Sequence, residues 1–154
     1  MSISFSYKLA ASYSEPRFDS SNQVEFRHLK FSLFPAQVYL VVGDCDISPP
    51  WDWTPMMQFV NAFVRVARKL SHDNEALYLF TENQPEIRFR RAGTTLSITT
   101  TYSPCTGICD LDEFVSATRR FALSTVRDLR QINPLVGDSS AFAELEAQIF
   151  AEPV

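Results

Sequence analysis

The cysteines are the first residues of this chain whose type and spacing suit chemistry. Cys105 and Cys109 are separated by three residues in a predicted strand-to-helix loop. Such a pair suits a redox couple or half of a metal site, with Cys45 and a histidine as further zinc ligands. Zinc sites, however, prefer two intervening residues and two such pairs. The spacing therefore favours small buried thiols beside a helix start, and the helix N-terminus is expected to lower the pKa of Cys109.

Carboxylates are the second group with chemical potential. Asp44, Asp46 and Asp52 lie close together in the sequence, and Asp110 precedes a predicted helix. Paired carboxylates are able to share a proton or to hold a metal ion. Aspartate is also an ordinary residue of loops and helix caps. Because nothing in the sequence fixes the separation of these carboxylates, they do not predict a catalytic or metal site.

The remaining chemistry-bearing side chains are two histidines. His28 lies in a predicted strand, and His72 lies at the end of a predicted helix, where histidine commonly complements the helix dipole. The sequence contains no glycine-rich phosphate loop, no H-E-x-x-H and no G-x-S-x-G motif. We therefore expect no catalytic residue, no metal ligand and no cofactor, and we predict that the protein is not an enzyme.

Residues 43–55 form the most unusual segment, and we name it the acidic loop. It contains both tryptophans, Trp51 and Trp53, with Asp44, Asp46 and Asp52, and no lysine or arginine occurs from residue 31 to residue 64. Tryptophan is enriched at interface hot spots, prolines reduce the entropy lost on docking, and carboxylates speed association with a basic partner. These five residues are the predicted partner-binding site. In the alternative reading, a tryptophan packs under the following helix and the aspartates only cap and solvate the loop.

The elements that position these residues follow from hydrophobic periodicity. Apolar alternation predicts strands over residues 3–13, 24–34, 38–42, 77–81, 87–90 and 96–100. Apolar stripes at helical spacing predict helices over residues 54–72, 110–132 and 139–150. The fold class is α+β, in the order βββ-α-βββ-α-α. We expect a mainly antiparallel sheet of about six strands with the helices packed on one face.

Cap and turn residues refine these boundaries. Thr54 is the expected N-cap of the first helix, and Asp110 with Glu113 resembles a capping box on the second. The glycine at Ala92-Gly93 is expected to turn the chain with a positive φ. The strand that carries Arg88, Arg90 and Arg91 is expected to present these cations to solvent.

Length and charge bound the kind of protein. The chain has 154 residues and is expected to form a single domain spanning residues 1–154. A net charge of −4 disfavours nucleic acid as a partner and suits a basic protein. Neither a signal peptide nor a transmembrane helix is predicted. Three cysteines do not suggest a disulfide framework, so we expect reduced thiols and a cytoplasmic protein with no membrane contact, in which a homo-oligomer is possible.

Three stretches in sequence order suggest a family. They are the helix from Trp53 through Val60, the string Y-L-F-T-E-N-Q-P-E-I-R-F at residues 78–89, and L-D-E-F at residues 111–114. Together they make residues 24–132 resemble small bacterial immunity-type proteins encoded beside polymorphic toxins of contact-dependent and type VI secretion systems. The resemblance implies a non-enzymatic cytoplasmic inhibitor that occludes its cognate toxin, which would be basic at the contact surface.

Two other functions stay open at this point. Thirteen phenylalanines suit a domain that holds an apolar small molecule between its sheet and helices, although an ordinary aromatic core explains them equally well. A thiol-dependent enzyme that uses Cys105 or Cys109 is the third hypothesis.

Overall fold

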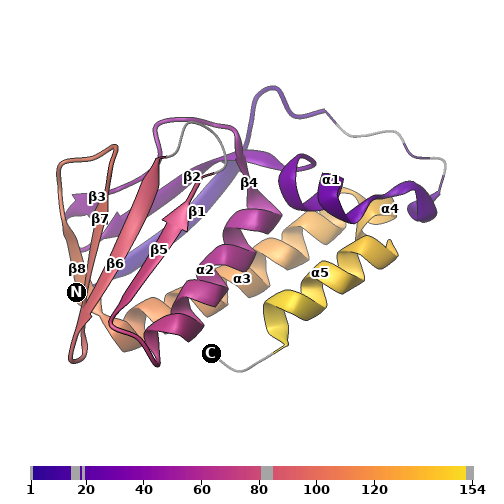
Figure 1. The fold of residues 1–154 in the computed structure, drawn as a ribbon. Coiled ribbons are helices and arrows are strands. Elements are labelled where there is room, and N and C mark those ends of the chain that lie inside the picture. Colours follow the sequence, from indigo (N-terminus) through magenta and orange to yellow (C-terminus); the bar gives the residue numbers. More distant parts are fainter. Residues whose placement is uncertain (1, 15–17, 19, 81–84, 152–154) are drawn as a thin grey trace.

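The computed structural model describes residues 2–14, 18, 20–80 and 85–151, which form an α+β fold (Figure 1). Eight strands lie in two antiparallel sheets: β1 (Ile3–Leu9), β2 (Pro35–Val42), β3 (Cys45–Asp46) and β4 (Thr54–Pro55) in one, and β5 (Glu75–Leu79), β6 (Glu86–Ala92), β7 (Thr95–Thr100) and β8 (Gly107–Asp110) in the other. The helices of the described residues are the 3-10 helix η1 (Ser21–Gln23) and α1 (Phe26–Phe31), α2 (Met56–Leu70), α3 (Leu111–Ile132), α4 (Pro134–Gly137) and α5 (Ser140–Phe150).

The first sheet is organised around β2. β1 pairs with it antiparallel, from Ile3 opposite Val42 to Leu9 opposite Ala36. β3 and β4 pair with opposite ends of β2 on its other side. Every second residue of β2 is fully buried, whereas Tyr39 faces solvent. β2 is therefore the central strand of this sheet, but only one of its faces is covered.

The second sheet follows the order β5-β6-β7-β8 along the chain. Ile87 and Phe89 of β6 are buried, and Arg88 and Arg90 between them are exposed, as their alternation predicts. Gly93 has a φ of 63° in the turn from β6 to β7, which confirms the expected positive φ. One face of this sheet therefore joins the core, and the other faces solvent.

The core lies between the sheets and the long helices α2 and α3 (Figure 1). Rings from both layers interlock: Phe63 of α2 contacts Phe5 at 5.6 Å, Phe89 at 5.6 Å and Phe114 at 6.3 Å between centroids. Phe121 of α3 stacks on Phe5 at 4.9 Å. Edge-to-face and offset ring contacts of this kind add to the stability gained from burying the ring area. Among the described residues, none of the helices combines the length and the apolar character needed to cross a bilayer.

The two sheets approach each other most closely where β8 passes β2. A Cβ on Gly107 would lie 2.5 Å from the Cβ of Val42. No side chain fits in that space, so the absence of one at residue 107 lets the two strands come together. The single six-stranded sheet expected from the sequence is thus replaced by two four-stranded sheets that share one core.

The strand predicted over residues 24–34 is wrong. This segment follows η1 and contains the helix α1, and His28 lies in that helix rather than in a strand. Val24, Leu29 and Leu33 are buried at near-helical spacing, whereas Phe31 is exposed. The apolar residues therefore fit period two and period 3.6 about equally, and tertiary packing selects the helix.

Helix starts agree with the sequence only in part. α2 begins at Met56, and Thr54 lies in β4 and does not cap it. Asp110 precedes α3 without a side-chain cap. α3 ends at Ile132 as expected, with Asn133 as its C-cap, and Ser139 caps α5 by accepting a hydrogen bond from the amide of Phe142 at 3.1 Å.

Candidate functional site

The acidic loop is held to β2 at both ends. Gly43 has a φ of 61° and turns the chain back so that β3 pairs with the end of β2, and its amide donates to the carbonyl of Ser2 at 2.7 Å. At the far end Thr54 pairs with Ala36. The amide of Met56 then donates to the carbonyl of Phe34 at 3.0 Å. The intervening residues therefore span a fixed distance.

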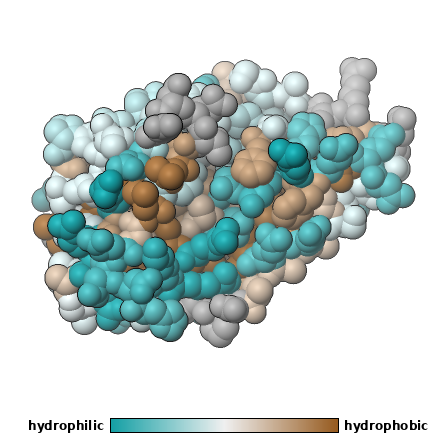
Figure 2. All heavy atoms as spheres, viewed as in Figure 1, coloured by the Kyte–Doolittle hydropathy of each residue, from teal (hydrophilic) through white to brown (hydrophobic). Residues whose placement is uncertain are grey.

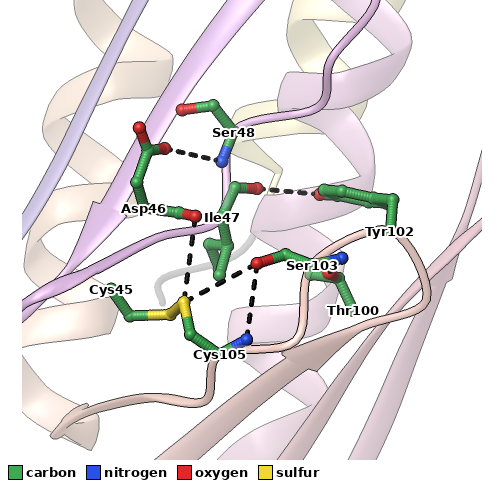
Figure 3. Close-up of a disulfide and its surroundings, with 8 residues drawn as sticks. All are labelled: Cys45, Asp46, Ile47, Ser48, Thr100, Tyr102, Ser103 and Cys105. Atoms are coloured by element: carbon green, nitrogen blue, oxygen red, sulfur yellow. Dashed lines mark hydrogen bonds between the residues drawn. A yellow bond between two sulfur atoms is a disulfide. The ribbon is translucent and has the colours of Figure 1, made fainter.

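A disulfide between Cys45 and Cys105 ties the beginning of the loop to the segment between β7 and β8 (Figure 3). From the same segment, the hydroxyl of Tyr102 donates to the carbonyl of Ile47 at 2.9 Å. The side chain of Ile47 is fully buried. The first part of the acidic loop is thus attached to the second sheet by one covalent bond at Cys45 and one hydrogen bond at Ile47.

Local hydrogen bonds shape the loop around Ser48 (Figure 3). Its amide donates to the Asp46 carboxylate at 3.0 Å, and its hydroxyl accepts from the amide of Leu40 at 2.9 Å. Hydrogen bonds from the hydroxyl and the amide of Ser48 lower the pKa of Asp46, so this exposed side chain stays ionised. Burial raises the pKa of Tyr102, and the negative charge of Asp46 raises it further.

The two tryptophans lie against each other. The rings of Trp51 and Trp53 stack at 4.8 Å with an interplanar angle of 11°. Trp51 also meets Phe80 at 4.8 Å and Tyr102 at 5.2 Å, both edge to face. Its indole nitrogen donates to the hydroxyl of Thr54 at 3.0 Å. Both indoles are half-buried, so each is partly core and partly surface.

The five predicted site residues therefore divide into two groups. Asp44, Asp46 and Asp52 are exposed, and the stacked pair Trp51 and Trp53 lies partly beneath the surface. Within the part of the chain that the structure describes, no three side chains of histidine, cysteine, aspartate or glutamate come together as a metal site would require. The arrangement offers negative charge and a rigid aromatic support for contact with another molecule.

The expectation of reduced, unpaired thiols is wrong for Cys45 and Cys105, which form the disulfide. Cys109 is a buried thiol beside the start of α3, as expected, whereas Cys105 is not a free thiol. The pKa of Cys109 is raised to about 11 rather than lowered, first by burial and then by the carboxylates of Glu113 and Asp110. Spacing along the chain does not reveal a pair 60 residues apart, because only the meeting of the two sheets brings these cysteines together.

Sequence reasoning missed two residues that matter to the site and the role of one cation elsewhere. Phe80 and Tyr102 support the indoles, and both come from outside the acidic loop. Arg91 was expected to be a solvated surface cation, but its guanidinium donates to the carbonyls of Leu70 at 2.6 Å and of Gly93 at 2.8 Å. It therefore ties the β6–β7 turn to the end of α2.

Among the residues that the structure describes, aromatic side chains fill much of the core between the sheets and the helices. Phe59 and Phe63 stack at 4.3 Å, and Tyr78 meets them at 5.6 Å and 5.5 Å. Phe34, Phe89 and Phe114 are also fully buried. These contacts explain the high phenylalanine content through the core and give no support to an apolar-ligand site in this layer.

Comparison with known proteins found no matching protein-family model, no matching curated protein and no matching solved structure. The function is therefore argued from the geometry of this chain alone.

Proposed function

We propose that this protein is a non-enzymatic protein-binding module, and that it acts as an immunity protein whose acidic loop blocks the surface of a cognate toxin. The observation that carries the proposal is the construction of the loop. It is anchored at both ends on β2, and its first part is also held by the disulfide at Cys45 and by Tyr102 at Ile47. Its three carboxylates nevertheless remain exposed.

Rigidity favours a binding role because a loop that is already ordered loses little entropy when it docks. The β3 pairing, the disulfide and the hydrogen bonds of Ser48 fix the backbone that carries Asp44 and Asp46. The prolines that flank Trp51 act in the same direction. The loop is therefore preorganised before any partner arrives.

Electrostatics defines the kind of partner. Asp44, Asp46 and Asp52 place three negative charges on one loop that has no lysine or arginine. A basic surface would be attracted from a distance, so the carboxylates would act mainly on the rate of association. The proposed partner is a protein with lysine and arginine at its contact surface, such as a toxin that binds a phosphate-rich substrate.

The tryptophans have a narrower role in this proposal than the sequence suggested. Because Trp51 is held between its neighbours and hydrogen-bonded to Thr54, it supports the loop more than it reaches outward. Changing Trp51 to alanine would therefore alter both the stability of the protein and its binding to the partner. The exposed carboxylates are the better test of the interface.

The experiment measures binding to the product of the adjacent upstream gene. Changing Asp44, Asp46 and Asp52 to asparagine should lower the association rate constant by about tenfold or more and flatten its salt dependence. The matched control changes Asp73 and Asp138 to asparagine and Glu144 to glutamine. These three side chains are also exposed and give the same change in net charge.

The immunity role is wrong if the adjacent gene product neither binds nor is inhibited. The site assignment is wrong if the loop variant and the control variant associate with equal rates. Circular dichroism of both variants confirms that their folds are retained.

The compartment is part of the proposal. The sequence predicts the cytoplasm, and that location remains a prediction. Disulfides persist in oxidising compartments and are rare in the reduced cytosol, so the Cys45–Cys105 bond favours an oxidising compartment as the place where the folded protein meets its partner. Alkylation of thiols in intact cells distinguishes the two locations.

A further inference from the structure

Asn61 is a polar residue buried in the middle of α2. Only 2% of its surface is exposed. Among the residues that the structure describes, none forms a hydrogen bond with its carboxamide, which is able to donate two hydrogen bonds and to accept two. A buried polar group without a partner lowers stability, and such groups are uncommon in folded proteins. The fold alone therefore does not account for an asparagine at this position.

The side chain of Asn61 lines a cavity between α2 and α5, two helices that lie side by side (Figure 1). The cavity has a volume of about 570 Å³, and its other lining residues are Arg65 and Arg68 of α2 with Gln148 and Ala151 at the end of α5. Asn61, Arg65 and Arg68 are spaced four and then three residues apart, so they follow one face of α2. Among the five lining residues Asn61 alone is buried, so it forms the floor of the cavity. Cavities of this size hold small molecules in many proteins.

The lining of this cavity is positively charged. It contains two arginines and no acidic residue, because Glu144, one turn before Gln148 on α5, is not part of it. Arg65 is exposed and forms no ion pair with a described carboxylate. Arg68 donates to the carbonyl of Ile149 at 2.7 Å, which fixes the end of α5 beside α2. Figure 2 shows hydrophilic surface over the second half of α2 that extends onto α5.

We propose that the cavity between α2 and α5 is a binding site for a small oxyanion, a carboxylate or a phosphate. The N–H groups of the Asn61 carboxamide and of the Arg65 guanidinium would donate to the oxygens of the ligand, and the amide of Gln148 would donate from α5. Hydrogen bonds from a guanidinium to an anionic oxygen are stronger than those between neutral groups. Arg68 would add positive charge and hold α5 in position. The ligand would thus supply the hydrogen-bond partner that Asn61 lacks.

The chemistry of the lining excludes other classes of ligand. A metal ion or an organic cation would meet two guanidinium groups and no carboxylate, thiol or imidazole. An apolar molecule would cover the Asn61 carboxamide without offering it a hydrogen bond, which costs free energy. An oxyanion accepts hydrogen bonds and carries the opposite charge, so it fits both features. This site shares no residue with the acidic loop and does not depend on the proposed toxin binding.

The probes are citrate and inorganic phosphate, each titrated into the oxidised, full-length protein near neutral pH. Sodium chloride keeps the ionic strength constant, so that general screening does not change during the titration. NMR follows the side-chain amide of Asn61 and the Nε–H of Arg65. We expect at least one probe to shift both signals and to saturate with a Kd of about 1 mM or below, whereas chloride alone does not. Tighter binding of citrate indicates a carboxylate as the natural ligand, and tighter binding of phosphate indicates a phosphate.

Variants separate a binding role of Asn61 from a structural one. Asn61→Leu should weaken binding by about tenfold or more and should also raise the urea midpoint of the free protein, because an apolar side chain replaces an amide without a partner. Thr125→Val is its control, since it removes another buried polar atom without a partner but lies on α3, away from the cavity lining. Arg65→Gln should weaken binding by about tenfold, whereas Arg127→Gln, at an exposed arginine of α3, should not.

Four results would overturn the proposal. They are no saturable binding of either probe at about 20 mM, unchanged binding by the Asn61→Leu variant, an equal loss in the control variants, and binding that occurs only after Glu152→Gln. The last would make the carboxylate of Glu152, which follows Ala151 in the sequence, the occupant of the cavity. A lower urea midpoint of Asn61→Leu would likewise contradict the absence of a partner for this amide. None of these outcomes bears on binding by the acidic loop, which is tested by its own substitutions.

Discussion

The thiol of Cys109 differs chemically from the two cysteines that form the disulfide. It lies in β8, directly before Asp110 and the start of α3, and its side chain is buried. Burial disfavours the charged thiolate, and the carboxylates of Glu113 and Asp110 add electrostatic repulsion. These effects raise its pKa from 9.0 to about 11 and outweigh the helix N-terminus that the sequence analysis relied on.

The first prediction is that Cys109 is inert near neutral pH. With its pKa raised, the thiol stays protonated until the pH approaches about 11, so the nucleophilic thiolate is scarce at pH 7.5. We expect iodoacetamide to label the native, oxidised protein far more slowly than the protein unfolded in urea, and the native rate to rise as the pH is increased above 9. Mass spectrometry of the intact chain measures both rates.

A thiol-dependent enzyme would give a different result. Its cysteine would react as fast in the native state as in the unfolded state, or faster, with a rate that levels off at a pH below 9. Such a profile would show that the environment of Cys109 lowers its pKa. It would restore the thiol-enzyme hypothesis that the disulfide and the burial of Cys109 disfavour.

Strand β8 shows how one residue type allows two elements to meet. Gly107 is buried and directly faces Val42 of β2, where a Cβ would approach within 2.5 Å. Its φ is not positive, unlike those of Gly43 and Gly93, so backbone strain plays no part at this position. The requirement is for space alone, and β8 and β2 join the two sheets at this point.

The second prediction is that Gly107→Ala destabilises the fold by about 1–3 kcal/mol through overpacking. Adding Val42→Ala should recover part of this loss, because the smaller side chain makes room for the new methyl group. Urea unfolding of both single variants and the double variant gives the coupling energy. Thr106→Ala, at the exposed neighbouring residue, is the control. Strict additivity of the two single changes would contradict a direct contact between residues 42 and 107.

Elements were predictable from the sequence where one periodicity dominated. The alternation in β6 and β7 and the apolar stripe of α3 each specify their element locally. β3, β4 and β8 have two to four residues, too few for a period, and exist because β2 and β7 offer backbone partners. The segment at 24–34 fitted two periods and was assigned the wrong one.

The candidate site, like the elements, was predictable from the sequence only in part. The acidic loop is identified by its composition, because no other segment combines tryptophan with aspartate in this way. The exposure of Trp51 and Trp53 depends on Phe80 and Tyr102, which lie 27 or more residues further along the chain. Long-range contacts of this kind leave no local sequence signal, so the half-burial of the indoles had to come from the structure.

Across the whole molecule, the Cys45–Cys105 bond links the two sheets that β2 and β8 bring together. Its sequence separation of 60 residues means that it removes much of the freedom of the unfolded chain, worth about 4 kcal/mol in the loop-entropy model. The bond also holds the acidic loop against the second sheet. Stability and the shape of the proposed interface are therefore coupled through one covalent link.

The third prediction separates the effect of the disulfide on stability from its effect on the shape of the acidic loop. Changing Cys45 and Cys105 together to serine should lower the free energy of unfolding by about 2–4 kcal/mol in urea titrations, and reduction of the wild-type protein should do the same. Hydrogen exchange should then speed up most at Asp46 and Ile47, which the bond holds in place. Cys109→Ser serves as the control, because that thiol forms no disulfide. Unchanged stability after reduction would show that the core alone fixes the junction.

The same bond reports the compartment in which the protein works. If that compartment is oxidising, acid quenching of intact cells followed by alkylation in denaturant should add one alkyl group per chain, at Cys109. A reduced cytosol would leave all three cysteines of the chain free and give three groups. The Cys45→Ser, Cys105→Ser variant, which adds one group in either case, calibrates the labelling. Three groups on the wild-type protein would return the cytoplasm as its location while leaving the binding proposals intact, because β3 pairing and the Tyr102 hydrogen bond would still hold the acidic loop.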